Sequence, residues 1–441
     1  MAIPFEKTSG ALGLNRRRFL KAASAAVGVL AIPCHIPARA LGKNGAVAPS
    51  ERIVLGGIGL GGRGSGDLSA MLGESDVQVV AVCDVKKTQR LAMKNMVDGH
   101  YGTKGCAAYG DLRQLLAERT DIDAVLIATG DRWHAPAAVR AMRAGKDVYC
   151  EKPSCLTIEQ GRLVVETARN YGRVYQTGAQ RLSEANHVFA IEMARTGMLG
   201  PIHTAYADCR WRDGLRRDWL PAEPLPSKDD LDWDAFIGPC PWRPYNPGYL
   251  SGGWYHFYDF ATDVAMWGAH TVAQVLPGLD LTGVSTIQFQ YDSPDGSMVT
   301  RFSNGLKVVL ARGPNGNYWN GSCGERFDGP EGWAAAADGY SRPDVSSPAL
   351  LSHYKKIIGD YLARTQHPMN HIRDFLNCVR SRRTTVANPE VMYHSMVICL
   401  AADVCEQLQR NLTFDLHKAE FVGDAEANRF RSRAMREPWC V

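Results

Sequence analysis

The chain lacks three features that would assign it to common classes of protein. Its formal net charge is only +4 over 441 residues, with no basic stripe or tail, which argues against a nucleic-acid binder. No apolar run approaches the ~20 residues that span a bilayer. The twelve cysteines include no CxxC pair and no zinc spacing. We therefore expect no metal site, and most cysteines should be small buried hydrophobic residues.

The N-terminal segment carries a targeting pattern. The stretch NRRRFLKAA precedes a short apolar run at residues 22–32, which resembles a twin-arginine export signal. Small residues at Ala38 and Ala40 suit cleavage, and an uncleaved membrane tether is the alternative. We expect a signal peptide over 1–40 and a linker over 41–50. The protein should then be periplasmic or otherwise exported by the twin-arginine route, with no stable membrane insertion after cleavage.

The rest of the chain changes character near residue 180. Strand-like runs at 53–58, 77–84, 121–130, 147–153 and 173–180 alternate with helical patterns, which predicts an α/β doubly wound parallel sheet. We assign residues 51–178 to an NAD(P)-binding Rossmann domain. Residues 179–441 contain alternating segments such as GVSTIQFQYD and GLKVVLARG, followed by helices near the C-terminus. We expect there an α+β substrate-binding domain with a large, mostly antiparallel open sheet.

A glycine-rich turn follows the first predicted strand. GIGLGGRG contains two overlapping GxGxxG frames, beginning at Gly57 and Gly59. Glycines in such a turn let backbone amides approach a pyrophosphate at a helix N-terminus. We prefer the frame Gly59, Gly61 and Gly64, because it lets the strand run its full length.

Asp84 ends the second strand and favours one dinucleotide over the other. A carboxylate there accepts the ribose hydroxyls of NAD and repels the 2′-phosphate of NADP. Lys86, Lys87 and Arg90 follow closely, so NADP stays open. A cofactor that leaves the cytosol with a folded protein must be tightly held, which makes tightly bound NAD our hypothesis.

Lys152 lies in YCEKPSCLT, at the carboxyl end of a predicted parallel strand. Ligands of such sheets bind at this edge. A desolvated lysine beside a cationic nicotinamide can have a lowered pKa. From spacing alone, a surface turn lysine is an equally good interpretation.

Several of these stretches together resemble one family. GIGLGGRG, AVCD, DIDAVLIATGDRWHAPAAVRAMRAGKDVYCEKP and VYQTGAQ are similar to the Gfo/Idh/MocA oxidoreductases, which take their name from glucose–fructose oxidoreductase and inositol dehydrogenase. GPCPWRPYNP, NHIRDFLNCVRSRR and GDAEANRFRSRAMREPW resemble an exported bacterial branch. The likeness covers about residues 51–439.

The resemblance implies roles for individual residues. The residues expected at the cofactor are Gly59, Gly61, Gly62, Arg63, Gly64, Asp84, Thr129, Asp131, Trp133, His134, Glu151, Lys152 and Gln180. The residues expected at the substrate are Arg181, Trp254, Tyr255, His256 and Trp267. The usual proline after Thr129 is Gly130 in this chain. Family likeness also suggests a homodimer or homotetramer built through the open face of the second sheet.

His270, in DFATDVAMWGAHTVAQ, corresponds to the acid/base histidine of the family. A near-neutral imidazole can accept a hydroxyl proton as hydride leaves the same carbon. The carboxylate usually found four residues earlier is Met266 here, and a further one three residues later is Ala273. Asp263 lies about two helical turns before His270 and would share its face. We therefore expect His270, Lys152 and Asp263 to be catalytic, with helix capping as the alternative for Asp263.

Three functions remain open at this point. The first is an NAD(P)-dependent oxidoreductase acting on a secondary alcohol of a sugar, polyol or glycoside. The second is a redox-neutral glycoside hydrolase or epimerase that oxidises the sugar transiently at C3. The hydrolase branch of the family carries tyrosine where this chain has Trp267, which weakens that interpretation. The third is a non-catalytic sugar- or NAD-binding protein.

Overall fold

The computed structural model describes residues 47–210, 214–250, 252–291, 293, 296–312 and 321–441. The predicted signal peptide and most of the predicted linker lie outside these ranges. The chain divides into two compact units, one ending at Arg52 and the other running from Ile53 to Val441. The first contributes the short 3-10 helix η2, Pro49–Glu51. Within the described ranges, no helix combines the length and the apolar character needed to cross a membrane.

The first sheet of the second unit is parallel and six-stranded, in the order β3-β2-β1-β4-β5-β6. This is the doubly wound order in which ligands bind outside the carboxyl ends of the strands. Near-continuous burial along β1, β4 and β5 fits strands covered on both faces. The strands are β1 Ile53–Ile58, β2 Val77–Cys83, β3 Ala107–Tyr109, β4 Ala124–Ile127, β5 Asp147–Cys150 and β6 Tyr175–Thr177.

Helices connect these strands, as the alternating pattern predicts. They are α2 Gly62–Leu72, α3 Lys87–Tyr101, α4 Leu112–Glu118, α5 Asp131–Arg143 and α6 Ile158–Asn170. The sequence analysis did not anticipate β3, which has three residues and is too short for a periodic signal. Helix α5 begins directly after Gly130, which has an extended conformation and serves as its N-cap.

The second sheet has nine strands in the order β13-β12-β11-β7-β10-β9-β8-β14-β15. All paired neighbours are antiparallel except β7 and β10, so the expectation of a mostly antiparallel sheet is confirmed. The strands are β7 Thr204–Asp208, β8 Thr286–Gln290, β9 Met298–Phe302, β10 Lys307–Ala311, β11 Glu325–Gly329, β12 Gly332–Ala336, β13 Asp344–Val345, β14 Leu412–Asp415 and β15 Glu420–Phe421.

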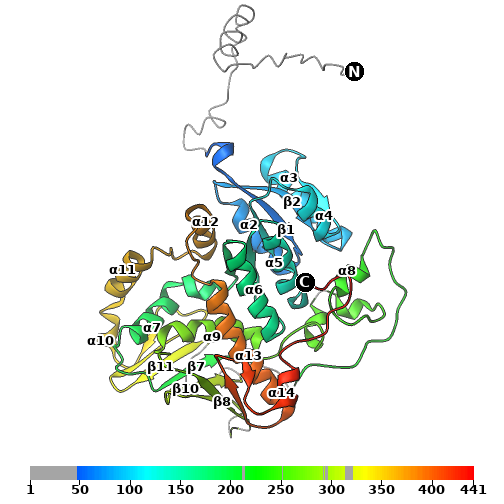
Figure 1. The fold of residues 1–441 in the computed structure, drawn as a ribbon. Helices are drawn as coiled ribbons and strands as arrows, with labels where there is room; N and C mark the ends of the chain where they lie inside the picture. The colour runs from blue at the N-terminus through cyan, green and yellow to red at the C-terminus, as the bar shows by residue number, and fades with distance from the viewer. Residues whose placement is uncertain (1–46, 211–213, 251, 292, 294–295, 313–320) are drawn as a thin grey trace, which may run out of the picture. The chain divides into compact units, whose positions relative to one another are not determined.

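Helices α7 and α9 pack on this sheet, and α13 packs against both α9 and α6 (Figure 1). The helix α13 therefore joins the two halves of the unit. The α-helices of the second half are α7 Ala185–Arg195, α8 Trp233–Ile237, α9 Ala265–Val275, α10 Pro348–Leu351, α11 Tyr354–Thr365, α12 His371–Ser381, α13 Pro389–Leu408 and α14 Ala425–Arg429. The 3-10 helices are η3 Gln180–Ser183, η4 Pro247–Tyr249, η5 Gly253–His256 and η6 Leu276–Gly278.

The helix α12 belongs to the core of the first sheet although it lies far along the chain. Its buried residues Phe375, Leu376 and Val379 share one hydrophobic cluster with Leu55 of β1 and Leu126 of β4. A cut of the chain near residue 178 therefore separates sequence segments that share one core.

Free thiols confirm the interpretation of the cysteines. All eleven cysteines of the described residues are free, and all but Cys440 are buried. They fill core volume as small hydrophobic side chains.

Candidate cofactor and active site

The three glycines of the preferred frame have three different surroundings. Gly59 has φ +70°, and a Cβ built there would lie 2.2 Å from Thr129 Cγ2. A Cβ on Gly64 would lie 2.8 Å from Ala128 Cβ, so this glycine allows α2 to pack closely on β4. Space above Gly61 and its neighbour Gly62 is open to 4 Å. A tight turn, an open approach and close packing are the requirements of a pyrophosphate-binding turn, and the surroundings of Gly59, Gly61 and Gly64 fit them in that order.

Asp84 is bonded to this turn. Its Oδ2 accepts a hydrogen bond from Leu60 N at 3.0 Å, and its Oδ1 accepts one from Lys86 N at 2.9 Å. Burial raises the pKa of the carboxyl, while the two amide bonds oppose that rise. A carboxylate has about four acceptor positions, so two remain for ribose hydroxyls. The open glycine turn and this acceptor together fit the adenosine diphosphate half of NAD.

The turn after β4 is fixed by side chains that bond to protein. Trp133 Nε1 donates to Ala235 O at 2.9 Å. The two ring nitrogens of buried His134 lie 2.6 Å from Pro153 O and 3.0 Å from Thr129 O. Both rings therefore brace the turn, and direct contact of either with the cofactor stays a prediction. Thr129 Oγ1 is buried without a hydrogen-bond partner among the described residues.

Asp131 lies in the first turn of α5, close to Lys152. Burial raises the pKa of its carboxyl to about 7, opposed by the charge of Lys152. Its carboxylate accepts a backbone hydrogen bond from Thr262, just ahead of α9. The predicted nicotinamide side of the site is thereby tied to the helix that carries His270.

Lys152 reaches across to α9. Its Nζ donates to Met266 O at 3.1 Å, which places the ammonium one helical turn before His270. Glu151 Oε1 accepts from Gln180 Nε2 at 2.8 Å, and its Oε2 accepts from Lys152 N at 3.2 Å. The predicted residues Glu151, Lys152 and Gln180 therefore lie together at the carboxyl edge of the first sheet.

Sequence reasoning missed a second carboxylate in this cluster, Asp67 of α2. Arg63 joins the two acids: its Nη2 lies 3.0 Å from Asp67 Oδ1 and its Nε 3.4 Å from Glu151 Oε1. Burial and the charge of Glu151 raise the pKa of Asp67 to about 7. The i, i+4 spacing of Arg63 and Asp67 was the available signal.

His270 is buried, with 4% of its surface exposed. Its Nδ1 has no hydrogen-bond partner among the described residues. Burial, followed by the charges of Lys152 and Arg181, lowers the pKa of the imidazole well below its ordinary value. The ring is therefore neutral at neutral pH and has a nitrogen available to accept a proton.

The expected helical placement of Asp263 is wrong. Helix α9 begins at Ala265, so Asp263 precedes it and does not share the face of His270. The N-cap residue is Val264, and its N–H donates to Asp403 Oδ1 at 2.8 Å, so helix capping by Asp263 stays a prediction. Burial raises the pKa of both Asp403 and Glu406 on α13, and the charge of Asp263 adds to the rise at each carboxyl. Among the described residues, the strongest charge effects on His270 come from Lys152, Arg181, Arg63 and His371, and none of these groups is a carboxylate.

The predicted substrate residues fall into two places. Arg181 pairs with Asp338, with Nε–Oδ1 and Nη2–Oδ2 distances of 2.9 and 2.8 Å, and its charge acts on His270. Trp267 lies under the guanidinium of Arg210, whose carbon is 5.4 Å from the ring centre. Asp338 comes from a distant loop and carried no sequence signal.

The other three predicted substrate residues lie on η5. Trp254 lies against the Gly130 turn, where it would contact a Cβ at 3.5 Å. Tyr255 and His256 have ring centres 4.6 Å apart, and His256 is exposed. Trp254 is therefore beside the predicted nicotinamide turn, and roles for Tyr255 and His256 stay predictions.

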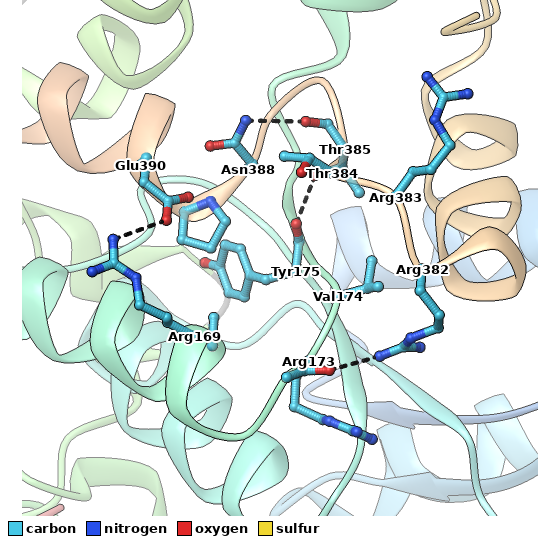
Figure 2. A pocket seen from close by; sticks show the side chains of 13 residues that line it. Arg169, Arg173, Val174, Tyr175, Arg382, Arg383, Thr384, Thr385, Asn388 and Glu390 are labelled. Atoms are coloured by element: carbon cyan, nitrogen blue, oxygen red, sulfur yellow. Dashed lines mark hydrogen bonds and ion pairs between the residues drawn. The ribbon is translucent and has the colours of Figure 1, made fainter.

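A hollow of about 280 Å³ lies away from this site. Figure 2 shows Tyr175 at its centre, with the side chain of Arg383 directed away from it. Its lining comes from the start of β6, the end of α6 and the α12–α13 connection. This is the amino end of β6, opposite the edge where doubly wound sheets bind ligands, so we do not assign it to the active site.

Comparison with known proteins gives matches at both ends of the second unit. A family model described as the NAD-binding Rossmann fold of the GFO_IDH_MocA oxidoreductase family matches residues 53–179. The model of that family's C-terminal alpha/beta domain matches residues 350–441.

A curated relative from Shewanella pealeana, a glycosyl hydrolase family 109 protein, is 30% identical over 224 residues, covering 45% of this chain and 47% of the relative. The chain thus spans about half the length of the curated relatives it matches.

Solved structures share the fold at low sequence identity. The WlbA dehydrogenase from Chromobacterium violaceum, in complex with NADH and UDP-GlcNAcA, has a TM-score of 0.58 at 17% identity, over 84% of this chain and 98% of that one. The myo-inositol 2-dehydrogenase from Lactobacillus plantarum has a TM-score of 0.52 at 16% identity, over 82% and 98%.

Proposed function

Because the chain belongs to the Gfo/Idh/MocA family of oxidoreductases, we propose that it transfers hydride to or from a secondary alcohol of a sugar, polyol or glycoside, with NAD as its cofactor. The observation that carries this proposal is the contact between Lys152 Nζ and Met266 O, which brings a lysine ammonium beside a neutral, buried His270. An ammonium and a free imidazole nitrogen are the groups needed to hold a hydroxyl oxygen and take its proton.

Lys152 and His270 have different roles in the proposed reaction because they differ in protonation state. NAD, when bound, accepts or returns hydride at nicotinamide C4. Lys152, as an ammonium, donates a hydrogen bond to the substrate oxygen and stabilises negative charge that develops on it. His270 accepts the hydroxyl proton in the oxidative direction and returns it in the reductive direction. Because the pKa of His270 is low, the imidazole is in the neutral, proton-accepting form before the reaction begins.

The surroundings of Asp84 favour NAD over NADP. Lys87 pairs with Asp229, and Arg90 Nη1 donates to Asp84 O at 2.8 Å. Both cations are therefore engaged within the protein, and a 2′-phosphate would meet the carboxylate of Asp84. Mass spectrometry of nucleotide released from the denatured protein tests the preference, and NADP in place of NAD would overturn it.

A second candidate is glycoside cleavage without net redox change, in which the cofactor is oxidised and reduced within each turnover. The glycosyl hydrolase family 109 relatives favour it. The presence of Trp267 where hydrolase-branch members carry tyrosine weighs against it.

One pair of assays separates the two candidates. The purified protein is given sugars and polyols with added NAD, and aryl glycosides with no added cofactor, alongside His270→Ala. NADH formation supports the oxidoreductase, and aglycone release without net NADH supports the redox-neutral hydrolase. If the protein binds NAD but shows neither activity, the remaining interpretation is a non-catalytic binding protein. Both activities must disappear in His270→Ala if the histidine has the proposed role.

We also propose that the protein leaves the cytosol by the twin-arginine route, on the basis of the NRRRFLKAA motif. Cell fractionation of the full chain tests this, with Arg16 and Arg17 both replaced by lysine as the comparison. Export that persists in the double variant would overturn the proposal.

A further inference from the structure

A segment from the second half of the chain crosses the carboxyl edge of the first sheet. We call residues 229–238 the strap; it contains α8 and is anchored by buried Leu231, Trp233 and Ile237. It attaches to the first half at two places, the loop after β2 and the first turn of α5, which follows β4. Because β2 and β4 flank β1 in the sheet, these attachments lie on either side of the glycine turn that follows β1.

The first attachment is a short antiparallel bridge between Lys86 and Leu231. Lys87 N donates to Asp230 O at 2.9 Å, and Asp232 N donates to Val85 O at 3.1 Å. Lys86 N also bonds the carboxylate of Asp84. The strap therefore pairs, backbone to backbone, with the loop that presents the predicted ribose acceptor.

The second attachment passes close to Gly130, where the family resemblance leads us to expect proline. Arg132 donates from Nε and Nη2 to Phe236 O at 2.8 and 2.6 Å, and its guanidinium lies over the rings of Phe236 and Phe260. A Cβ at position 130 would lie 2.6 Å from Arg132 Nη1. A proline ring would therefore occupy the path by which Arg132 reaches the strap. Glycine at 130 and arginine at 132 work as a pair.

The C-terminal tail holds the strap from the other side. Arg436 donates to Asp234 Oδ1 at 2.6 Å and to Gly238 O at 3.0 Å. Trp439 Nε1 donates to Asp234 Oδ2 at 3.2 Å, and its ring meets Trp133 edge to face at 5.3 Å. The tail thus fastens the strap to the helix α5.

We infer that the strap closes the adenosine side of the cofactor site and slows the release of NAD. The strap and its tail come from the second half of the chain, so this closure is added to the six-stranded sheet from outside it. A binding element that must detach before ligand leaves acts mainly on the dissociation rate. This inference rests on the proposed use of NAD and accounts for the tight retention that export would require.

A reversible cross-link tests the inference within one protein. Lys86 and Leu231 form a pair without hydrogen bonds between themselves, where Cα atoms lie about 4.5 Å apart, within the range of a disulfide. In Lys86→Cys/Leu231→Cys loaded with NADH, release is followed by fluorescence with excess NAD as the chase. We expect the oxidised form to release NADH at least about tenfold more slowly than the same protein after reduction.

Loosening the strap should have the opposite effect. We expect Arg436→Ala to release NADH several-fold faster than the wild type, while Arg429→Ala, an exposed arginine on α14 of the same C-terminal region, should not change release. Circular dichroism establishes that Arg436→Ala is folded, and the cross-link test does not depend on it.

Each adverse result has a definite meaning. The inference that the strap slows release would be overturned by equal NADH release rates from the oxidised and reduced protein. It would also be overturned if the two cysteines failed to cross-link. If the protein does not bind NADH at all, both the proposed use of NAD and the inferred role of the strap would be overturned. Slow release without turnover of any sugar would uphold the strap and count against the proposed reaction, because the release assay contains no substrate.

Discussion

The buried acids Asp67 and Glu151 should share a proton, and the stability of the protein should depend on pH as a result. With the pKa of Asp67 raised from 3.8 to about 7, the folded protein binds more protons than the unfolded chain between these values. Stability is therefore lost as the pH rises through this window. The full shift corresponds to roughly 4 kcal/mol, of which about 2–3 kcal/mol falls between pH 5 and pH 8.

Asp67→Asn removes this dependence. The amide cannot ionise and keeps a donor for Glu151, as the protonated acid does. We expect the variant to gain about 2–3 kcal/mol on the wild type between pH 5 and pH 8, measured by urea unfolding of the apoprotein at both values. Asp67→Ala loses the donor and should be less stable than Asp67→Asn at both.

Asp121→Asn is the matched control. Asp121 is half exposed, and its hydrogen bond with Arg119 lowers the pKa of the carboxyl, so it stays ionised throughout this range. Its effect on the urea midpoint should be the same at pH 5 and pH 8. An equally constant effect of Asp67→Asn would refute the shared proton.

Three further substitutions address the site directly. Gly59→Ala should weaken NAD binding at least about tenfold in a titration, because left-handed alanine costs roughly 1–2 kcal/mol before its clash with Thr129; unchanged affinity would mean that the turn is not the cofactor site. His270→Ala should lower kcat at least about 100-fold, whereas Asp263→Ala should stay within about threefold of the wild type, and the reverse order would restore Asp263 as the assisting group. Asp84→Asn should narrow the preference for NAD over NADP, measured as the ratio of the two dissociation constants, because it removes the charge that repels a 2′-phosphate; an unchanged ratio would show that Asp84 does not select the cofactor.

Local patterns predicted the first half of the fold well, for physical reasons. Doubly wound sheets alternate buried strands with helices, and the glycine turn obeys steric rules that act within a few residues. Gly59 and Gly64 are glycine because their own surroundings leave no room for a Cβ. The short strand β3 escaped because three residues carry no periodicity.

Contacts between distant segments could not be predicted in this way. Two examples are the pairing of Arg181 with Asp338 and the packing of α12 on the first sheet. Both depend on how segments far apart in the sequence come together in the folded chain. The misplacement of Asp263 came from extending a helical period past the point where the helix begins at Ala265. Two helical turns of spacing are informative only when both residues lie on the helix.

Methionine in place of a carboxylate at position 266 affects how the site sets the protonation state of His270. A carboxylate beside a histidine stabilises the imidazolium and raises the pKa, which favours holding a proton. In this chain burial and the charges of Lys152 and Arg181 act in the opposite direction. The resting site therefore presents a neutral imidazole, and the proton it takes must leave readily. With methionine at position 266, no carboxylate there stabilises the imidazolium, so the proton returns readily to substrate or solvent.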